Sequence, residues 1–343
     1  MSILALETSC DDTCAALIDV GGRTRSNVIS SQLEHARFGG VVPEIASRHH
    51  LELVNAIVAQ ALEDAAMTLD QVELIAATQG PGLVGALLVG LSTAKALAAA
   101  RELPFAAVDH LQGHVAANFL AEEGPFEPPF VCLIASGGHT LLAHVTEHHR
   151  YEQLGRTLDD AAGEAFDKGA RMLGLGYPGG PALEALAAAG DPAAFAFPGS
   201  LRRRAAGGRG LGRSAFAQSL DFSFAGVKTA LLYALRELTP EEAQARAADL
   251  AASYQAAIVD ALLARAEQAL EQTGIGRLAL GGGVAANGEL RRRLLELDAA
   301  VHIPAGALCT DNAAMIASAA RFGEQLAYPR YLGLDAYATG ERP

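Results

Sequence analysis

The chain has 343 residues, half of them hydrophobic, which is enough for one large domain or two domains of ordinary size. It carries 26 Lys and Arg residues against 39 Asp and Glu residues, a formal net charge of −13. This charge excludes attraction of nucleic acid by the overall field of the protein, so any such contact requires a local basic segment. The four cysteines form no Cys-x-x-Cys pair, which predicts reduced thiols rather than a disulfide framework.

The N-terminus predicts neither export nor membrane insertion. The opening segment "MSILALETSC" has no basic region and contains Glu7, so it is not expected to be a signal peptide. The most apolar run, residues 82–94, is shorter than the roughly 20 residues of a membrane-spanning helix. We therefore expect a cytoplasmic protein that does not contact a membrane, with the apolar run forming a buried helix.

The first hundred residues predict alternating strands and helices. Apolar residues at 3–6 and 14–20 flank the polar turn "ETSCDDT", which indicates a strand, a turn and a second strand. The segment "PEIASRHHLELVNAIVAQALEDA" has the apolar spacing of a helix. A strand is expected over residues 72–78, ended by Gly-Pro-Gly, and the buried helix over 83–100 follows it.

The next helix is expected to carry two histidines. In "VDHLQGHVAANF", His110 and His114 are one helical turn apart, so their rings can point the same way, which is the spacing of a metal site or of ordinary surface and capping residues. Leu111 stands where a zinc protease of the His-Glu-x-x-His type has its glutamate, so a metalloprotease would lack its water activator. A third ligand could come from "CTDNAAM", where either Asp311 or Asn312 is expected to cap a helix.

A second strand-turn-strand, "FVCLIASGGHTLLAHV", begins at residue 130 and repeats the plan of the opening segment, which suggests a duplication. Its turn, Ser136-Gly137-Gly138, is one of three glycine turns at element ends; the others are Gly179-Gly180 and Gly281-Gly282-Gly283. Backbone N–H groups in such turns can bind phosphate oxygens. None of them matches the two standard glycine motifs for nucleotides, but together they favour nucleotide binding.

The second half is predicted to be largely helical. A helix through "TLDDAAGEAFDKGARMLG" would place four charged residues on one face and four apolar residues on the other. The charged residues are Asp160, Glu164, Asp167 and Arg171, and the apolar residues are Leu158, Ala162, Ala165 and Leu173. Further helices are expected from "DFSFAGVKT" onward, over roughly 243–273, and after the turns at 281 and 311, and the last residues are expected to form a loose tail.

One segment is strongly basic. "LRRRAAGGRGLGR" carries five arginines and no acidic residue: Arg202, Arg203, Arg204, Arg209 and Arg213. Such a charge run is either a solvated loop or a site for nucleic-acid phosphates. A second basic cluster, at residues 291–293, falls on a predicted helix, where exposed arginines are common.

The motifs together resemble one known family. "LALETSCDDT", "GGVVPEIASR", "TQGPGLVGALLVG", "VDHLQGHVAANF", "LIASGGHTLL", "DDAAGEAFDKGARMLGLGYPGGP", "DFSFAGVKT", "LGGGVAANGELR" and "CTDNAAMIA" are similar to segments of the bacterial tRNA N6-adenosine threonylcarbamoyltransferases. That family has archaeal and eukaryotic relatives and was once described as O-sialoglycoprotein endopeptidase. The resemblance runs in order from residue 3 to about residue 320.

The resemblance implies an α/β fold of the actin/hexokinase/Hsp70 type, with two duplicated lobes, a mixed sheet in each and a nucleotide cleft between them. The N-terminal lobe would comprise residues 1–108 joined by a C-terminal segment, 311–343. The second lobe would comprise residues 109–310, with the basic insertion at 202–213, which is longer than is usual in the family.

The implied activity is acyl transfer to tRNA. The threonylcarbamoyl group of threonylcarbamoyl-AMP would pass to N6 of adenosine 37 in tRNAs that read ANN codons, and AMP would leave. The resemblance also implies two protein partners, an inactive paralogue and a small ATPase, for which the helix near residues 30–62 is the expected docking surface. The alternatives are an ATP-dependent small-molecule kinase of the same fold, a metalloprotease and a non-catalytic scaffold.

The resemblance also assigns residues. His110, His114 and Asp311 would bind one divalent metal, iron first and zinc as the alternative. Asp12 and Asp167 would be catalytic, Asp167 by orienting the base or accepting a proton. Position 12 is usually Glu in the family, so here the carboxylate is one methylene shorter. The substrate would contact Ile134, Ala135, Ser136, Gly137, Gly138, Asp167, Gly180, Glu184 and Asn287.

Overall fold

The computed structural model describes residues 1–120, 126–198 and 219–338, which form two compact units. The first unit contains residues 1–128, 147–150 and those from 304 onward, and the second contains 129–146 and 151–303. Residues 109–128, 147–150 and 304–310 therefore belong to the first unit, although the family resemblance placed them in the second. The reason is that the strand ending at Asp109 pairs within the first sheet, and the helix after it packs on a helix of the same unit.

The sheet of the first unit has five strands. Their order is β3 (Thr24–Ser31), β2 (Asp12–Asp19), β1 (Ser2–Glu7), β4 (Leu74–Gly80) and β5 (Phe105–Asp109). Strands β1, β2 and β3 are antiparallel neighbours, whereas β1, β4 and β5 run parallel. The expected opening hairpin and the strand at 72–78 are confirmed in kind and nearly in extent. Because β1, β4 and β5 are parallel, their carboxyl ends lie at one edge of the sheet, where a functional site is commonly found.

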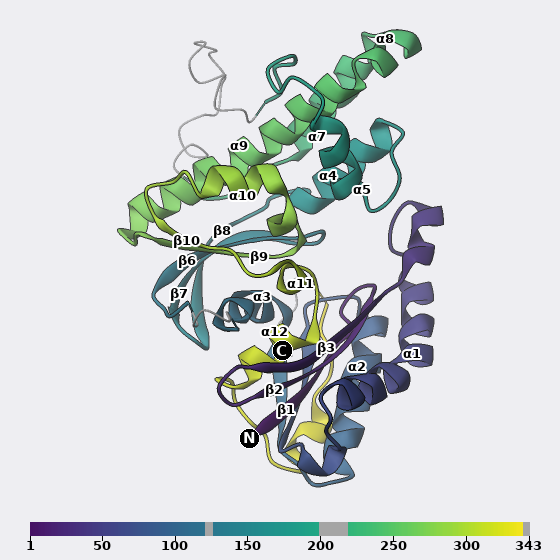
Figure 1. The fold of residues 1–343 in the computed structure, drawn as a ribbon, viewed down its shortest axis with the longest axis vertical. Helices are drawn as coiled ribbons and strands as arrows, with labels where there is room; N and C mark the ends of the chain where they lie inside the picture. The colour runs from purple at the N-terminus through teal and green to yellow at the C-terminus, as the bar shows by residue number, and fades with distance from the viewer. Residues whose placement is uncertain (121–125, 199–218, 339–343) are drawn as a thin grey trace. The chain divides into compact units, whose positions relative to one another are not determined.

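Helices cover both faces of this sheet (Figure 1). α1 (Pro43–Asp64) and α2 (Val84–Ala99) pack on one face, against a core that includes Leu4 and Leu6. α3 (His110–Ala116) and α12 (Ala313–Ala320) lie on the other face and contact each other. Since side chains alternate along a strand, the odd-numbered residues of β1, including Glu7, point toward the α3 and α12 side. The short helices of this unit are η1 (Leu33–Phe38), η2 (Leu69–Gln71), η3 (Ala117–Phe119), α11 (Gly306–Cys309) and η6 (Arg330–Gly333).

The second unit repeats this topology. Its strand order is β10 (Ala300–His302), β9 (Arg277–Gly281), β6 (Phe130–Ala135), β7 (Thr140–Glu147) and β8 (Arg150–Arg156). The first strand of the unit is again central, with the next two strands on one side of it and two later strands on the other. β6 pairs antiparallel with β7 and parallel with β9, as β1 does with β2 and β4. The identical order supports the duplication that the two similar hairpins suggested.

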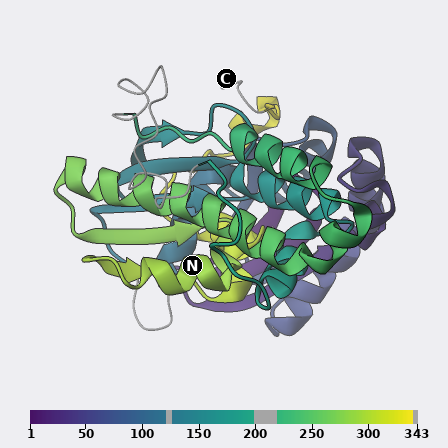
Figure 2. The same ribbon diagram turned by 90° about the horizontal axis from the view of Figure 1, so that it is seen from above.

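Helices of the second unit pack around α9, and Figure 2 shows several of them side by side. Their bounds are α4 (Ala162–Met172), α5 (Gly179–Ala187), α7 (Ala225–Arg236), α8 (Pro240–Ala245), α9 (Ala247–Thr273), η5 (Gly283–Ala286) and α10 (Gly288–Leu294). Among the described residues, α9 alone is long and apolar enough to span a membrane, but 67% of its apolar window is buried within the protein. It is therefore built like a core helix.

One predicted helix begins later than its charge pattern indicated. α4 starts at Ala162, so Leu158 and Asp160 precede it instead of sharing its faces. The side chain of Leu158 is exposed, and the hydroxyl of Thr157 donates to the carbonyl of Asp160 at 2.6 Å. This turn competes with helix formation because it uses the carbonyl of Asp160 locally. The carboxylate of Asp160 instead pairs with Lys168 and Lys228, at 2.8 and 2.6 Å.

Candidate functional site

The two histidines are placed by a capped helix. α3 follows directly from β5, and the Asp109 carboxylate accepts hydrogen bonds from the backbone N–H groups of Leu111 and Gln112, at 2.9 and 3.1 Å. The cap starts the helix at His110, so His114 lies one turn later on the same side. Both rings are nearly inaccessible, with 6% and 0% of the side chains exposed. The predicted one-turn spacing is confirmed, and the pair is buried.

Gly113 lets this helix approach α12. A Cβ atom at position 113 would lie 2.7 Å from Cδ1 of Ile316 and 3.2 Å from Cγ of Met315. The Ser318 hydroxyl of α12 donates to the carbonyl of Ala116 at 2.9 Å, which ties the two helices together. The close approach matters because α12 directly follows Asp311. Sequence reasoning missed the role of Gly113, for which a glycine inside a helix between two candidate ligands is the only signal.

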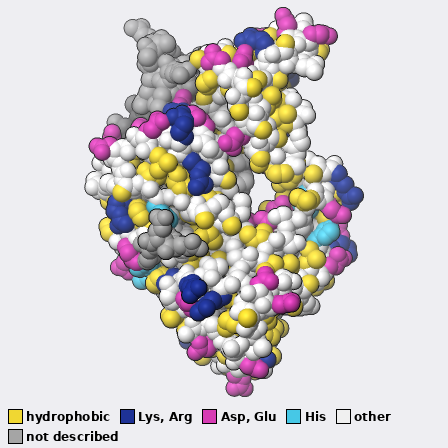
Figure 3. Space-filling model, in the orientation of Figure 1, with side chains coloured by type: hydrophobic (Ala, Val, Ile, Leu, Met, Phe, Trp, Pro, Cys, Tyr) yellow, Lys and Arg dark blue, Asp and Glu magenta, His cyan; other side chains and the backbone are white. Residues whose placement is uncertain are grey.

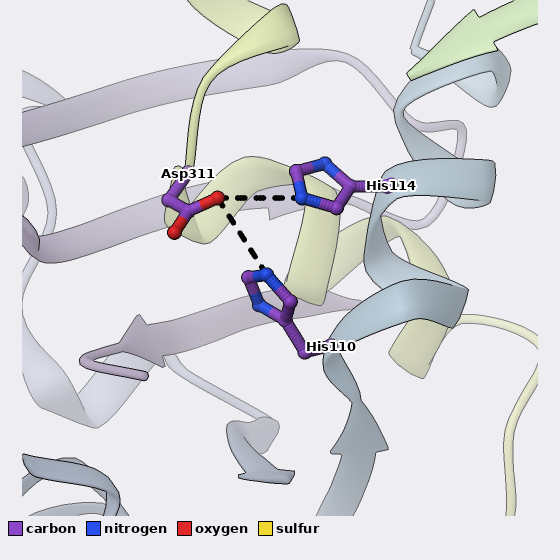
Figure 4. A group of neighbouring side chains, drawn as sticks. All are labelled: His110, His114 and Asp311. Atoms are coloured by element: carbon purple, nitrogen blue, oxygen red, sulfur yellow. Dashed lines mark ion pairs between the residues drawn. The ribbon is translucent and has the colours of Figure 1, made fainter. Parts of the chain in front are cut away.

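Asp311 lies beside both histidines. Asn312 is the residue that caps α12, because its Oδ1 accepts from the N–H of Met315 at 2.9 Å. The cap therefore falls on Asn312 and leaves the Asp311 carboxylate for another role. Asp311 Oδ1 lies 3.6 Å from Nε2 of His110 and 3.3 Å from Nε2 of His114 (Figure 4). Residues almost two hundred positions apart in sequence thus converge within the first unit.

These three side chains fit a metal ion. Their ligand atoms lie within 4.8 Å of one another. His114 is fully buried, and among the described residues neither of its ring nitrogens has a hydrogen-bond partner, since its approach to Asp311 lacks hydrogen-bond geometry. A buried ring without partners is costly unless something coordinates it. Two imidazoles and a carboxylate are donors that suit Fe(II) or Zn(II) and leave positions for substrate oxygens.

The field at this site is strongly negative. Burial alone would lower the pKa of His110, but the nearby charges of Asp311 and Glu7 outweigh it and raise this pKa to about 9. Burial also tends to raise the pKa of Glu7, yet the charge and hydrogen bond of His110 hold it below its ordinary value. A surplus of carboxylates over cations is the electrostatic setting that a divalent cation would neutralise.

Asp12, predicted to be catalytic, begins β2 in the same unit. Burial raises its pKa to about 7, and the charges of Asp311, Asp11 and Glu7 add to this effect, while a hydrogen bond from Ser31 opposes it. Near neutral pH this carboxyl is therefore divided between its protonated and ionised forms. A group with such a pKa can accept or donate a proton at working pH.

In the second unit, the turn after β6 is open. Ile134 and Ala135 end the strand, and the turn is closed by hydrogen bonds between Ser136 and His139, at 2.8 Å from the Ser136 N–H and 3.1 Å to its hydroxyl. Gly137 and Gly138 are exposed, and a Cβ atom on either would meet nothing within 4 Å. Their lack of side chains therefore has no packing reason, which is consistent with close approach of a ligand to the backbone.

The other predicted substrate residues connect helix N-termini. The Asp167 carboxylate accepts from the N–H of Gly179 at 2.8 Å, at the start of α5. Glu184 accepts from the N–H of Gly288 at 2.7 Å, at the start of α10. Asn287 caps α10 and donates to Gln255 at 2.9 Å. These carboxylates thus have structural partners, and they bring two helix N-termini, where anions bind, into one connected group.

The same group reaches the open turn. The N–H of Gly163, in α4, donates to the Ser136 carbonyl at 3.1 Å. A Cβ atom on Gly163 would lie 2.6 Å from that carbonyl oxygen, so this glycine is required by packing. Gly180, in contrast, meets nothing within 4 Å. Hydrogen bonds therefore link the predicted substrate residues of the second unit, which lie on β6 and its turn, on α4 and α5, and at the start of α10.

The predicted nucleic-acid residues Arg202, Arg203, Arg204, Arg209 and Arg213 lie outside the described residues. In the second basic cluster, Arg292 pairs with Glu289 and Glu296, and Arg293 pairs with Asp260 at 2.6 Å. Arg291 donates to the carbonyl of Ala285 at 3.1 Å. On the face drawn in Figure 3, Lys and Arg side chains of the described residues are scattered among acidic ones and form no continuous basic surface.

Solved structures share this fold. HypF from T. kodakarensis matches 94% of this chain with 47% of its own, at a TM-score of 0.60 and 16% identity. The (R)-2-hydroxyglutaryl-CoA dehydratase component A of Acidaminococcus fermentans matches 97% of this chain with 99% of its own, at a TM-score of 0.54 and 14% identity. The protein is thus an α/β protein of the actin/hexokinase/Hsp70-like class, with a mixed five-stranded sheet in each of two units and a candidate metal centre in the first.

Sequence comparison gives the family. The family model of tRNA N6-adenosine threonylcarbamoyltransferase (TsaD) matches residues 23–318. Relatives named tRNA N6-adenosine threonylcarbamoyltransferase include one from Pelobacter propionicus, 48% identical over 99% of this chain and 97% of its own length. Another, from Symbiobacterium thermophilum, is 51% identical over 92% of this chain and 90% of its own. The chain belongs to the tRNA N6-adenosine threonylcarbamoyltransferase family, which confirms the resemblance carried by its motifs.

Proposed function

We propose that this chain transfers the threonylcarbamoyl group from threonylcarbamoyl-AMP to N6 of adenosine 37 in tRNAs that read ANN codons. In this reaction the adenine amine attacks the carbamoyl carbon and a new N–C bond forms. The C–O bond to the AMP phosphate breaks, one amine proton is lost, and AMP leaves. Membership of the family supports the acyl transfer to tRNA, and the finer statements about donor, position and codon class are the proposal.

The observation that carries the proposal is the buried ring of His114 beside Asp311 and His110. Neither of its nitrogens has a hydrogen-bond partner in the part of the chain that the structure describes. A small-molecule kinase of the same fold has no need of such a ligand set. The proposed metal is Fe(II), with Zn(II) as the alternative, because both accept imidazole and carboxylate donors. When bound, the cation would polarise a substrate oxygen and offset charge that develops on the leaving phosphate.

Residues of the second unit would bind the adenylate. The exposed N–H groups of Gly137 and Gly138 would donate to phosphate or carbamoyl oxygens, in the manner of an oxyanion site. Gly180 and Asn287, at the starts of α5 and α10, would contact the adenylate from the same side as Asp167 and Glu184. Glu184 would accept from a ribose hydroxyl, as its family position implies. Ile134, Ala135 and Ser136 would line the reacting group.

Two carboxylates would handle the nucleophile. An exocyclic adenine amine is a weak nucleophile, so its orientation is expected to supply much of the rate. Asp167 would orient the adenine or accept its proton. Asp12, whose pKa is raised to about 7, is the second group able to exchange a proton near neutral pH.

The proposed tRNA contact uses the basic insertion. Arg202, Arg203, Arg204, Arg209 and Arg213 would bind phosphates, which the net charge of −13 does not otherwise favour. Replacing all five with Gln should flatten the slope of log affinity against log salt by about 4.5, if each arginine makes one phosphate contact that contributes roughly 0.9. Arg292→Gln, which removes an already paired arginine, is the control and should leave the slope unchanged.

We further propose a cytoplasmic complex in which an inactive paralogue and a small ATPase assemble on this chain. The candidate docking surface is α1 with η1, where Leu33, Phe38 and Leu51 expose 78%, 49% and 68% of their surfaces. Large exposed apolar side chains mark an interaction surface where they form a continuous patch.

The activity is tested in cells. Depletion of this protein should remove threonylcarbamoyl-adenosine from nuclease-digested tRNA, as measured by mass spectrometry. Wild-type protein should restore the nucleoside, whereas His114→Ala, expressed to the same level, should not. Persistence of the nucleoside after depletion, or full restoration by His114→Ala, would contradict the proposed reaction or the role of the metal centre respectively.

A further inference from the structure

A buried carboxylate stands behind the metal centre. Glu7 ends β1 and is fully buried. One carboxylate oxygen of Glu7 accepts a hydrogen bond from the N–H of Ser9. The other oxygen accepts from the hydroxyl of Thr78 at 2.6 Å and from Nδ1 of His110 at 3.0 Å. Ser9 Oγ also lies 3.2 Å from Nδ1 of His110. A buried carboxylate is costly, so this one persists because it is well supplied with donors.

The sheet dictates this arrangement. β1 and β4 are parallel, with Leu6 opposite Ala77, so Glu7 and Thr78 are neighbours at the carboxyl edge of the sheet. β4 and β5 are also parallel, and His110 is the first residue after β5. The Glu7 carboxylate on β1, the Thr78 hydroxyl on β4 and the His110 ring after β5 therefore lie at the same edge of the sheet.

We propose that Glu7 is a positioning residue that prepares His110 to bind the cation, an inference that rests on the proposed metal centre. An ionised carboxylate can only accept hydrogen bonds, so Nδ1 of His110 carries a proton and donates it to Glu7. Nε2 then faces Asp311, at 3.6 Å, and is the ring nitrogen left to coordinate the cation once its proton is displaced. Glu7 thus fixes the tautomer and the orientation of the ring and makes it more basic.

His114 provides an internal contrast. Among the described residues, neither of its ring nitrogens has a hydrogen-bond partner, so nothing behind it fixes a tautomer. Of the two imidazoles, His110 is the one that the protein orients in advance. The glutamate that opens the "ETSCDDT" segment therefore supports cation binding through its hydrogen bond to His110 and not as a ligand.

Glu7→Gln tests this role with almost no change in size. The Ser9 N–H must face the amide oxygen, so the amide NH₂ takes the position of the oxygen that faces Thr78 and His110. The amide then donates to Nδ1, and the neutral ring carries its proton on Nε2, the atom required for the cation. Zinc affinity, measured by competition with a chelator, should fall by about ten- to hundred-fold.

A spectroscopic signature separates positioning from a general structural role. In zinc-loaded, ¹⁵N-histidine-labelled protein, the His110 Nδ1–H proton should resonate far downfield because it bonds to a carboxylate. In Glu7→Gln this signal should move upfield or vanish. The double variant Glu7→Gln/His110→Ala should bind zinc no more weakly than His110→Ala. Glu34→Gln removes a histidine-facing carboxylate at the surface, 3.0 Å from His49, and should change neither the affinity nor the signal.

Each result is decisive. Wild-type zinc affinity and an unchanged Nδ1–H signal in Glu7→Gln would overturn the inference, as would an additive loss in the double variant. If circular dichroism shows that Glu7→Gln does not fold, the inference is tested with Thr78→Val, because that variant removes only the hydroxyl that donates to the Glu7 carboxylate. A several-fold weaker zinc affinity in Thr78→Val supports the inference, and wild-type affinity overturns it. If the wild-type protein itself binds no zinc, the proposed metal centre is overturned, and the inference about Glu7 falls with it; loss of affinity in the variants alone is the outcome that supports Glu7.

Discussion

The candidate metal centre of the first unit and the open turns of the second unit differ in burial and in the groups that they offer to a ligand. The metal centre is buried, and its three ligands come from two helix starts that a close helix contact brings together. The turns of the second unit are exposed at Gly137 and Gly138 and offer backbone N–H groups instead of charged side chains. The first site depends on the residues that pack around its ligands, whereas the second depends on the lack of side chains at Gly137 and Gly138.

This difference has a physical origin. A cation is held by charged and polar groups whose burial is costly, so they must be oriented by neighbours such as Asp109, Asn312 and Glu7. Backbone N–H groups in a turn need no such orientation, because the turn itself fixes them. We therefore expect the first site to fail when its packing is disturbed, and the second to fail only when its surface is blocked.

The largest expected effect is on the first site. His114→Ala should abolish binding of zinc or iron and reduce threonylcarbamoyl transfer on the order of 100-fold or more, because one of three ligands is lost. Metal content by mass spectrometry and transfer by nucleoside analysis measure the two effects. Circular dichroism should show a folded protein, since the ring makes no hydrogen bond to the described residues whose loss would unfold it. Retained metal at wild-type stoichiometry would remove His114 from the ligand set.

A packing change away from the ligands should act on the same site. Gly113→Ala places a Cβ atom 2.7 Å from Cδ1 of Ile316, so the Ile316 side chain must shift or α3 and α12 must move apart. We expect a loss of about 1–3 kcal/mol in the free energy of unfolding and a weaker zinc affinity. Urea denaturation and chelator competition are the measurements. If stability falls but zinc affinity does not, the helix contact is structural only.

The turns of the second unit should respond in the reverse way. Gly138→Ala adds a methyl group into open space, so the free energy of unfolding should change by less than about 0.5 kcal/mol. The KM for threonylcarbamoyl-AMP should nevertheless rise about ten-fold, because the methyl group occupies the surface that the ligand would approach. Gly163→Ala is the matched contrast, since its Cβ would lie 2.6 Å from the Ser136 carbonyl oxygen and should destabilise the fold. An unchanged KM in Gly138→Ala would remove this turn from the substrate site.

The smallest expected effect concerns Asp12 and pH. Burial raises its pKa to about 7 in the folded protein, above the ordinary value near 4 of the unfolded chain, so the folded state holds the proton more tightly. Stability from this group is therefore present at low pH and is lost as pH rises through 7. Asp12→Asn should raise the melting temperature by a few degrees at pH 8 relative to wild type, and by less at pH 5. An equal shift at both pH values would show that the carboxyl does not titrate as proposed.

The sequence alone determined the local elements and the family. The polar turn "ETSCDDT", the one-turn spacing of His110 and His114, and the glycine turn at 136–138 follow from periodicity and turn chemistry, which act between near neighbours. The ordered set of motifs indicated the family that the comparisons confirm. These features can be predicted from the sequence because each depends on a few adjacent residues.

Only the tertiary structure decided which distant residues meet. The cap on α12 falls on Asn312 and frees Asp311, and α4 begins at Ala162 because a turn uses the carbonyl of Asp160. The roles of Glu7 and Gly113 appear only when parallel strands end at one edge and two helices touch. Strand order and helix contacts depend on the packing of the whole unit, and no local pattern in the chain specifies them.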